Sequence, residues 1–463
     1  MAEKGEIKDS QVRCAFFLPG KKRCCKMLVA KGSKYCGQHQ EADSARKRIP
    51  CPLDPNHNVY EDQLGKHLHK CNAKPKPKPV YYSEGINSGL VDYVPCKEEM
   101  QPLAEFPTPL VEEFIQRVST AYTKHVTAIE EKCLTHQVMQ SSLQDPKNGT
   151  TALKHLKQQA SILGHLEKMG LLTSGTCFVE FGAGRGKLSH WIQLATCGDH
   201  GNQYVLVDRA NCRRKMDVYH KPDSGGPSFT RLLMDIEHLN LGHLECVNSC
   251  SNVVGVSKHL CGAATDLAIR CLCSTLPTVT ESLPSRHYHP HSLENPLLPI
   301  PDQMGTAVGK RPGVDDCTAL TLEENKKSKL SGHPPSCKFG SVMASCCHHR
   351  CNWASYVGRP FMEQLGFGPA DFHLLTLMSS WAVCGIRNNI SNDDDDGDDT
   401  HSNYRGYIPH PKESIGLQCK RLIDAGRVWY LRQRGFEAEQ CHYVDKNISL
   451  ENNLIIATRW SDQ

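Results

Sequence analysis

The feature that most constrains the fold is a glycine-rich turn between an apolar run and a helical pattern. Cys177 to Phe181 is apolar enough for a buried strand, and a helix is expected from Lys187. Gly182, Gly184 and Gly186 fall between them. This order is typical of a parallel α/β sheet whose turn approaches a ligand. A dinucleotide fingerprint would have glycine at position 187, and the lysine there argues against that fingerprint.

Further apolar runs, separated by helical patterns, continue this arrangement toward the C-terminus. A helix is expected near Leu417 to Gln433, and the runs Glu437 to Val444 and Asn453 to Thr458 would close the sheet as an antiparallel pair. We therefore predict an α/β fold over residues 171–463. The other strands are expected at Tyr204 to Val207, Arg231 to Met234, Val253 to Val256 and Phe339 to Ala344.

A helical segment over residues 111–170 precedes this sheet. Apolar residues at steps of three and four describe one stripe of a long helix from Val111 to Cys133. A second helix, Thr151 to Met169, ends at Gly170. The first stripe covers little more than about three heptads, so we expect it to contact its own domain, with a short coiled coil as the alternative.

Two stretches interrupt the α/β pattern. Residues 277–336 are rich in Pro, Ser and His and have no periodicity, and residues 390–404 include the acidic run Asp393 to Asp396. Such segments lack the apolar residues that a buried core requires. We predict loop or disordered insertions at both places, the second of them solvated and without chemistry.

The N-terminal segment is basic. Residues 1–79 hold 17 Lys and Arg against 8 Asp and Glu, although the whole chain has a formal net charge of only +4. Lys74 to Pro79 alternates Lys and Pro, which predicts an extended basic spacer opening a linker over residues 74–110. A basic segment of this kind indicates a polyanion partner, usually nucleic acid, with a merely soluble tail as the alternative.

Cysteine and histidine are frequent, at 24 residues each in a chain of 463. The N-terminus lacks the apolar stretch of a secretory signal, and the longest apolar runs are far shorter than the roughly 20 residues of a membrane-spanning helix. We therefore expect the chain in the cytosol or nucleus and not in a membrane. Because thiols stay reduced there, clustered Cys and His predict metal sites in preference to disulfides.

Two clusters have the ligand types of tetrahedral zinc sites. In the first, Cys24 competes with Cys25 as a ligand; in the second, His67 and Cys71 are four residues apart, so a helix would direct both toward one ion. With little apolar material nearby, metal binding is expected to supply the folding energy. The expected ligands are Cys14, Cys25, Cys36 and His39 within residues 12–40, and Cys51, His57, His67 and Cys71 within residues 48–73.

The glycine turn, read as Glu-x-Gly-x-Gly-x-Gly from Glu180, resembles motif I of Class I methyltransferases. That resemblance implies a Rossmann-like domain that binds S-adenosylmethionine, with the glycines close to the methionine part of the cofactor. An acid at the end of the next strand, Asp208, is expected to hold the ribose hydroxyls. Asp235 and Ile236 follow the third strand and fit the adenine-contact position.

The acceptor atom must be inferred from side chains at the later strand ends. An Asp/Asn-Pro-Pro-aromatic motif, usual for exocyclic amines, is absent. A 2′-hydroxyl needs a Lys, His or carboxylate to receive its proton. Lys258 and His259 follow the fourth strand, and Asp266 comes one short helical step later. We predict Lys258 as the general base, with His348 and His349 as rivals.

Those two histidines belong to the run Cys346 to Cys351, which follows the fifth strand and is open to several interpretations. We expect it to line the active site; the alternatives are that it binds a third metal ion, supplies a cysteine nucleophile for pyrimidine C5 methylation, or serves packing alone. The metal interpretation suffers because adjacent Cys and His residues cannot all face one ion without strained backbone.

The motifs Ser-Lys-His-Leu-Cys-Gly, Cys-Cys-His-His-Arg-Cys and Lys-Arg-Leu-Ile-Asp-Ala-Gly-Arg (residues 420–427) are similar to those of the tRNA 2′-O-methyltransferase family that modifies the fourth acceptor-stem nucleotide. The second zinc cluster resembles the CHHC-type finger of a minor-spliceosome protein and of certain tRNA methyltransferases. These resemblances imply tRNA as partner and S-adenosylmethionine and zinc as cofactors. The alternatives are a non-catalytic zinc-finger RNA-binding or splicing adaptor, or a methyltransferase for another RNA or a protein.

Overall fold

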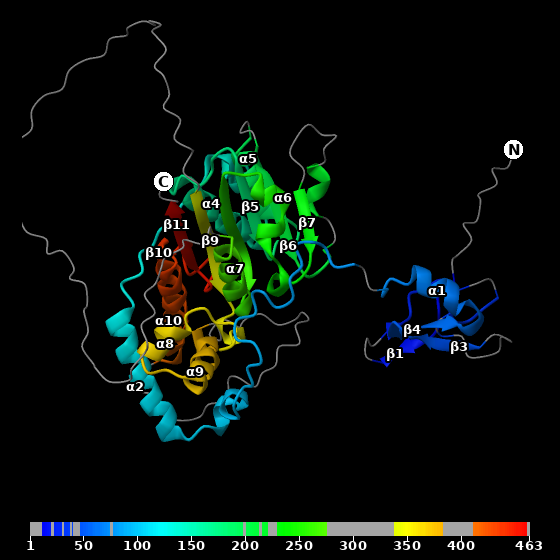
Figure 1. The fold of residues 1–463 in the computed structure, drawn as a ribbon, viewed down its shortest axis with the longest axis horizontal. Helices are drawn as coiled ribbons and strands as arrows, with labels where there is room; N and C mark the ends of the chain where they lie inside the picture. Colours follow the sequence, from blue (N-terminus) through cyan, green and yellow to red (C-terminus); the bar gives the residue numbers. More distant parts are fainter. Residues whose placement is uncertain are drawn as a thin grey trace, which may run out of the picture. The chain divides into compact units, whose positions relative to one another are not determined.

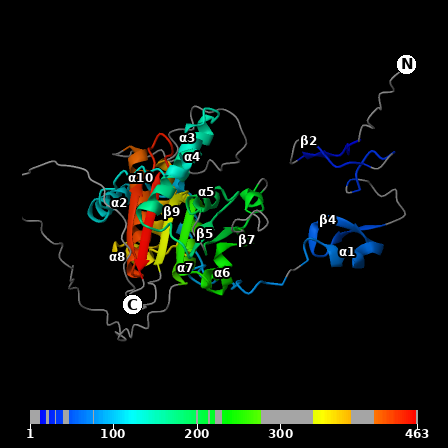
Figure 2. The ribbon, with the colours of Figure 1, turned by 90° about the horizontal axis from the view of Figure 1, so that it is seen from above.

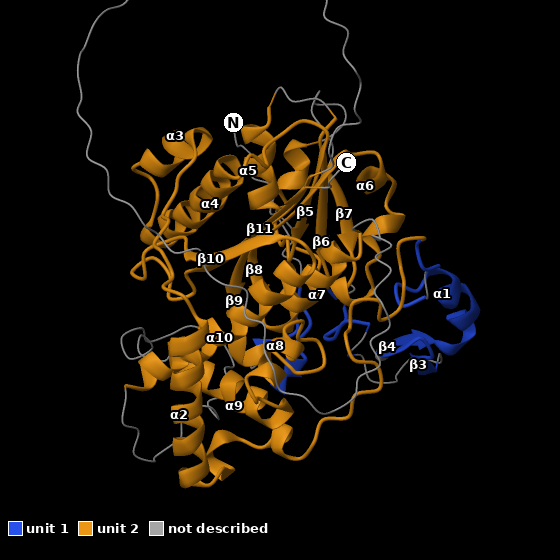
Figure 3. Ribbon diagram, turned by 60° about the vertical axis from the view of Figure 1, so that its left-hand side comes forward, with its two compact units in different colours: residues 1–79 blue, residues 80–463 orange. Residues whose placement is uncertain are grey.

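The computed structural model describes residues 12–19, 23–29, 32–37, 39, 47–74, 77–197, 201–212, 215–220, 229–275, 338–382 and 411–460. The chain divides into two compact units, residues 1–79 and 80–463 (Figure 3). The insertions expected at 277–336 and 390–404 lie outside the described residues. No helix in the described ranges combines the length and apolar character needed to cross a bilayer.

The first unit consists of two small modules whose buried residues are mainly cysteines. In one module, strands β1 (Phe17–Leu18) and β2 (Arg23–Cys24) pair antiparallel. In the other, β3 (Arg48–Cys51) pairs antiparallel with β4 (Asp54–Tyr60), and helix α1 (Leu64–Lys70) follows. The first module buries three cysteines and the second buries two cysteines and Val59, with only a few partly buried apolar side chains around them. Apolar burial this small does not hold a module together unaided.

The second unit contains a seven-stranded sheet in the order β10-β11-β9-β8-β5-β6-β7 (Figure 1). Five neighbouring strands, β7, β6, β5, β8 and β9, are parallel, whereas β11 is antiparallel to both β9 and β10. The predicted strands, including the closing antiparallel pair, are therefore present. Their bounds are β5 (Thr176–Phe181), β6 (Gln203–Asp208), β7 (Phe229–Leu233), β8 (Asn252–Cys261), β9 (Lys338–Cys346), β10 (Glu437–His442) and β11 (Asn453–Trp460).

Both faces of this sheet are buried, as continuous apolar strands predict. Helices α4 (Thr150–Lys168) and α5 (Lys187–Ala195) cover one face, where Phe178 and Leu206 are buried among helical leucines. Helices α7 (Ala263–Cys273) and α10 (Lys412–Gln433) contribute to the core on the other face (Figure 2). Further helices of this unit are α3 (Gln140–Gln144), α6 (Glu245–Asn248), α8 (Arg359–Gln364) and α9 (Pro369–Ser379).

The helix expected from Val111 to Cys133 is shorter than predicted. Helix α2 spans Thr108–His125, and its apolar stripe joins a core with α8, α9 and α10, so the expected contact with its own domain is confirmed. The prediction was wrong beyond His125, where the chain becomes extended and meets the edge strand β10. There the Lys132 amide donates to the His442 carbonyl oxygen at 2.8 Å, and the His442 amide donates to that of Glu130 at 2.9 Å. These hydrogen bonds to the exposed edge of β10 stabilise the extended conformation more than the local spacing of apolar residues favours a helix.

The strand order places a reversal between β5 and β8. The chain runs outward from β5 to β6 and β7, then returns to the other side of β5 with β8 and β9. Parallel strands that diverge in this way leave a crevice outside their carboxyl ends, where ligands bind in open α/β sheets. The glycine turn after β5 and the residues that end β8 lie at this reversal.

Candidate active site and metal centres

The structure brings each predicted zinc-ligand set together. One ligand atom from each of Cys14, Cys25, Cys36 and His39 lies within 4.8 Å of the others. The Sγ atoms of Cys14 and Cys36 each lie 3.4 Å from Nδ1 of His39. All three cysteines are buried, whereas the competing Cys24 is exposed. The geometry therefore favours Cys25 for this position.

The second cluster converges in the same way. Cys51, His57, His67 and Cys71 also place their ligand atoms within 4.8 Å of one another. The Sγ atoms of Cys51 and Cys71 are 3.8 Å apart, and Nε2 of His67 lies 3.2 Å from Sγ of Cys51. Asp54 Oδ2 lies 3.2 Å from the outer ring nitrogen of His57, the position at which carboxylates orient histidine ligands. Two sulfurs and two imidazoles at these separations suit one tetrahedral zinc ion.

The glycine turn takes a backbone conformation that side chains disfavour. Gly182 has φ +65°, and a Cβ atom there would lie 2.8 Å from the carbonyl oxygen of His259. Gly184 has φ +50° and no other atom within 4 Å of a Cβ position, so its backbone faces open space. The Gly184 amide donates to Asp208 Oδ2 at 2.7 Å. The turn is therefore tied to the end of β6 and keeps a backbone surface open to a ligand.

Glu180 is buried at the end of β5 and is held by helix α5. Its Oε2 atom accepts hydrogen bonds from both the amide and the hydroxyl of Ser189. Burial raises the pKa of Glu180 to about 7, against these hydrogen bonds and the nearby Arg231, which lower it. The carboxyl group therefore has a pKa near neutrality. The Ser189 amide and hydroxyl both donate to one of its oxygens and fix its orientation.

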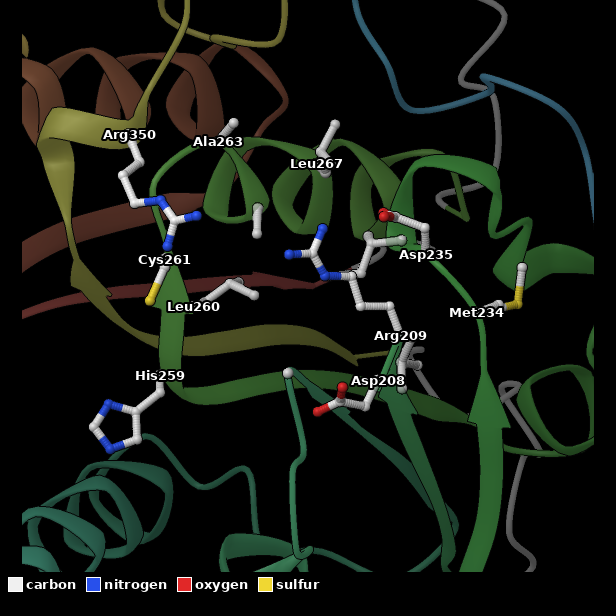
Figure 4. Close-up of a pocket in the computed structure, with 14 residues that line it drawn as sticks. Asp208, Arg209, Met234, Asp235, His259, Leu260, Cys261, Ala263, Leu267 and Arg350 are labelled. Atoms are coloured by element: carbon white, nitrogen blue, oxygen red, sulfur yellow. The ribbon is translucent and has the colours of Figure 1, made fainter. Parts of the chain in front are cut away.

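A cavity of about 400 Å³ opens at the carboxyl ends of β5, β6 and β8 (Figure 4). Asp208 and Asp235 contribute carboxylates, and Arg209 and Arg350 direct their guanidinium groups into it (Figure 4). Asp235 Oδ1 also accepts a hydrogen bond from the Glu237 amide at 3.1 Å, which fixes its side chain. The remaining lining is mostly apolar: Gly182, Val207, Met234, Ile236, Leu260, Ala263, Ala264 and Leu267, with His259 and Cys261.

A second cavity of about 370 Å³ shares Gly182 and His259 with the first, so the two adjoin at the glycine turn. Its lining includes three cationic side chains, those of Arg185, Lys187 and Lys258. Lys258 Nζ lies 2.9 Å from Nδ1 of His155 and 2.9 Å from Nε2 of His259. The full lining is His155, Gln159, Glu180, Gly182, Ala183, Gly184, Arg185, Lys187, Leu188, Lys258 and His259.

Burial and neighbouring charges lower the pKa values of Lys258 and of the two histidines beside it. Burial, with the neighbouring Lys187 charge, lowers the pKa of Lys258 to about 8, although Glu180 opposes this shift. Burial and Lys258 lower the pKa of His259 to about 4, and the same two causes lower that of His155. At neutral pH both imidazoles are therefore neutral and offer ring nitrogens as acceptors to the Lys258 ammonium. A cluster of this kind can hold a proton on Nζ or release it close to neutrality.

A β-bulge explains why the neighbours Lys258 and His259 both reach this cavity. Strand β8 pairs with β9 in register through Ser257 and Met343, and the register resumes at Leu260 and Ser345. One extra residue on β8 breaks the alternation of side chains between the two faces.

Comparison with known proteins identifies the family. Residues 157–458 match the family model described as methyltransferase TRM13, and residues 12–40 match a CCCH zinc finger in TRM13 protein. Residues 48–72 match a U11-48K-like CHHC zinc finger. The chain belongs to the TRM13 methyltransferase family.

Relatives along almost the whole chain agree with these matches. The proteins named tRNA:m(4)X modification enzyme TRM13 homolog of Mus musculus and Homo sapiens are each 39% identical over 472 residues, covering 96% of this chain and 94% of the relative. The tRNA:m(4)X modification enzyme TRM13 of Yarrowia lipolytica is 28% identical over 484 residues, covering 97% of this chain and 90% of that protein. No solved structure matches the chain.

Three of the predicted catalytic residues of this TRM13 family member lie outside both cavities. Asp266 is buried against Arg427, with Oδ2 2.6 Å from Nη2. His348 is buried with Nε2 3.0 Å from Oδ1 of Asp424, which also pairs with Arg427 Nη1 at 2.9 Å. His349 lines a separate cavity. The structure groups the first two with a buried ionic network and does not bring any of the three to Lys258.

Other residues at the site were not predicted. His155 is a surface position of an amphipathic helix in sequence, and only the approach of α4 to β8 brings it to Lys258. Arg209 immediately follows Asp208, and Arg350 lies within the Cys-Cys-His-His-Arg-Cys motif. The position of Arg209 directly after Asp208, a predicted cofactor-binding residue, could have indicated its place at the site. Nothing in the sequence around His155 indicated such a place.

Proposed function

We propose that this protein is an S-adenosylmethionine-dependent tRNA methyltransferase that methylates the ribose 2′-hydroxyl of nucleotide 4 in the acceptor stem. The observation that carries the proposal is the pair of adjoining cavities, one with Asp208 and Asp235 and the other with Lys258. The names of the relatives, which refer to tRNA modification, supply the substrate class.

The strand order supports a Rossmann-like Class I methyltransferase domain. Taken in chain order, the five parallel strands are arranged 3-2-1-4-5, the order of doubly wound nucleotide-binding sheets. Both cavities lie at the carboxyl ends of these strands, beside the reversal between β5 and β8. The methyl donor and the acceptor ribose would therefore meet at the part of the sheet where ligands bind in this architecture.

The residues of the first cavity fit S-adenosylmethionine. Gly184 lines the adjoining second cavity, where its open backbone accommodates a chain that approaches closely, because a side chain would fill that space. Asp208 offers carboxylate oxygens to vicinal hydroxyls, and Met234, Ile236 and Leu267 form apolar walls suited to a flat base. The bound cofactor would supply a methyl group on a positively charged sulfur.

Lys258 is the group that would manage the acceptor proton. Its neutral amine accepts the proton of the 2′-hydroxyl, and the resulting ammonium is stabilised by the ring nitrogens of His155 and His259. Arg185 and Lys187 line the same cavity and provide cations for the phosphates next to the acceptor ribose. Alignment of the acceptor and removal of its proton are the tasks that these residues would perform.

The first unit would add affinity for the tRNA. Its excess of Lys and Arg favours contact with phosphates, and two metal-stabilised modules can present those side chains with little apolar core. Contacts with phosphates release counterions from the RNA, and this release contributes less free energy as the salt concentration rises. The affinity for tRNA should therefore fall steeply with added salt.

In vitro methylation of a tRNA transcript tests the proposal. The substrate carries 2′-deoxyribose at nucleotide 4, and a control transcript carries the same change at nucleotide 5. Transfer of label from S-adenosylmethionine is expected to disappear for the first and to persist for the second. Undiminished transfer to the first transcript would rule out this acceptor atom, and absence of transfer to any tRNA would favour another substrate or a non-catalytic adaptor.

A further inference from the structure

Three cysteines converge where strands β8 and β9 end. Cys261 is the last residue of β8 and lies directly opposite Cys346, the last residue of β9. Their Sγ atoms are 3.4 Å apart. Cys347 follows, and its Sγ lies within 4.8 Å of both others. Residues 85 positions apart in the chain thus place three sulfurs around one point.

The backbone at Cys347 makes this convergence possible. Adjacent residues of a strand point to opposite faces, so Cys346 and Cys347 would ordinarily diverge. Cys347 instead has φ +50° and ψ +47°, and Asp92 is the only other non-glycine residue in the described ranges with positive φ. This left-handed conformation costs roughly 1–2 kcal/mol and persists where surrounding structure or a ligand requires it. It brings the second cysteine back toward the first.

The two zinc modules of the same chain give an internal standard. Their ligand atoms also fall within 4.8 Å of one another, with the sulfurs of Cys51 and Cys71 3.8 Å apart. A tetrahedral ion with zinc–sulfur bonds of about 2.3 Å separates two sulfur ligands by roughly 3.8 Å. The 3.4 Å between Cys261 and Cys346 is close to that value and far above the roughly 2.05 Å of a disulfide.

We propose that Cys261, Cys346 and Cys347 bind a third zinc ion, which ties the end of β8 to the turn after β9. Three thiols lose their protons on binding, so three thiolates and Zn²⁺ carry one net negative charge. Arg350, three residues after Cys347, lies on the same cavity wall as Cys261 and offers the compensating positive charge. The fourth coordination position is open to water, because Cys261 is exposed at the cavity.

The metal content of the full-length protein tests this assignment. The protein is purified under reducing conditions, passed over a weak chelating resin and analysed by plasma mass spectrometry. About three zinc ions per chain are expected, and about two in each of the variants Cys261→Ser and Cys347→Ser. Cys197→Ser, at an exposed cysteine after helix α5, is the matched control and should keep all three.

A second measurement does not depend on the folding of any variant. The metal-free protein is titrated with Co²⁺, and thiolate-to-cobalt charge-transfer absorption is followed for each equivalent added. A third equivalent that adds absorption supports the site. Saturation after two equivalents, unchanged zinc in both variants, or an intact mass that reveals a reducible disulfide between Cys261 and Cys346 would each overturn it.

Discussion

Replacement of Lys258 by methionine tests the proposed route of the acceptor proton. With its pKa lowered to about 8 by burial, about a quarter of Lys258 amines are neutral at about pH 7.5, against roughly one in a thousand for a lysine at 10.5. Only the neutral amine can accept a proton, and the fraction of neutral Lys258 grows as the pH rises toward this pKa. The single-turnover rate of the unaltered protein should therefore climb about tenfold per pH unit below about 8 and level off above it.

In Lys258→Met this rising limb should disappear, and the rate at the plateau should fall by about 10² to 10⁴, the range for loss of a general base. The assay is label transfer to tRNA under single-turnover conditions between about pH 6.5 and 9.5, with S-adenosylmethionine saturating. Lys154→Met, at an exposed position on α4, is the control and should keep the full profile. His259, with a pKa of about 4, and Glu180, with a pKa of about 7, would each give a limb that levels off at a lower pH than about 8. A variant that retains this limb would therefore refute Lys258 as the proton acceptor.

Three further predictions concern binding and stability. Gly182→Ala places a methyl group against the His259 carbonyl and should weaken S-adenosylmethionine binding at least tenfold by calorimetry, whereas Gly366→Ala, also at positive φ but with nothing within 4 Å of the added carbon, should leave binding unchanged. Arg427→Met removes the guanidinium group that pairs with two buried carboxylates and should lower the free energy of unfolding in urea by about 3–5 kcal/mol, while exposed Lys446→Met should change it by less than about 0.5 kcal/mol. The double variant Cys36→Ser, Cys71→Ser, which removes one ligand from each N-terminal zinc site, should unfold the first unit and weaken tRNA binding in a gel-shift assay, yet leave calorimetric binding of S-adenosylmethionine in place; equal loss of both would contradict separate roles.

The sheet was predictable from sequence because its central strands are buried on both faces. Runs such as Tyr204 to Val207 and Val253 to Val256 are apolar throughout, and helical patterns separate them. The glycine turn and the two zinc-ligand sets were also recognisable, since each depends on residue types at short spacings. These patterns lie within short stretches of the chain, so they can be recognised without the tertiary structure.

What sequence did not reveal depends on contacts between distant segments. The end of α2 is fixed by the edge of β10, about 300 residues later, and no local pattern contains that information. Asp266 was predicted as a catalytic residue, but in the structure it pairs with Arg427, which is 161 positions away in the chain. In the same way, Cys261 acquires its sulfur neighbours only when β8 and β9 pair.

The bulge in β8 restricts how relatives of this protein can diverge. Removal of one residue between Ser257 and Leu260 would restore regular pairing and exchange the faces to which the following side chains point. Insertions elsewhere need only lengthen a surface loop, which costs little free energy. An alignment of homologues should therefore contain no gaps between Gly255 and Gly262, however much the lengths of the two interrupting stretches vary from species to species.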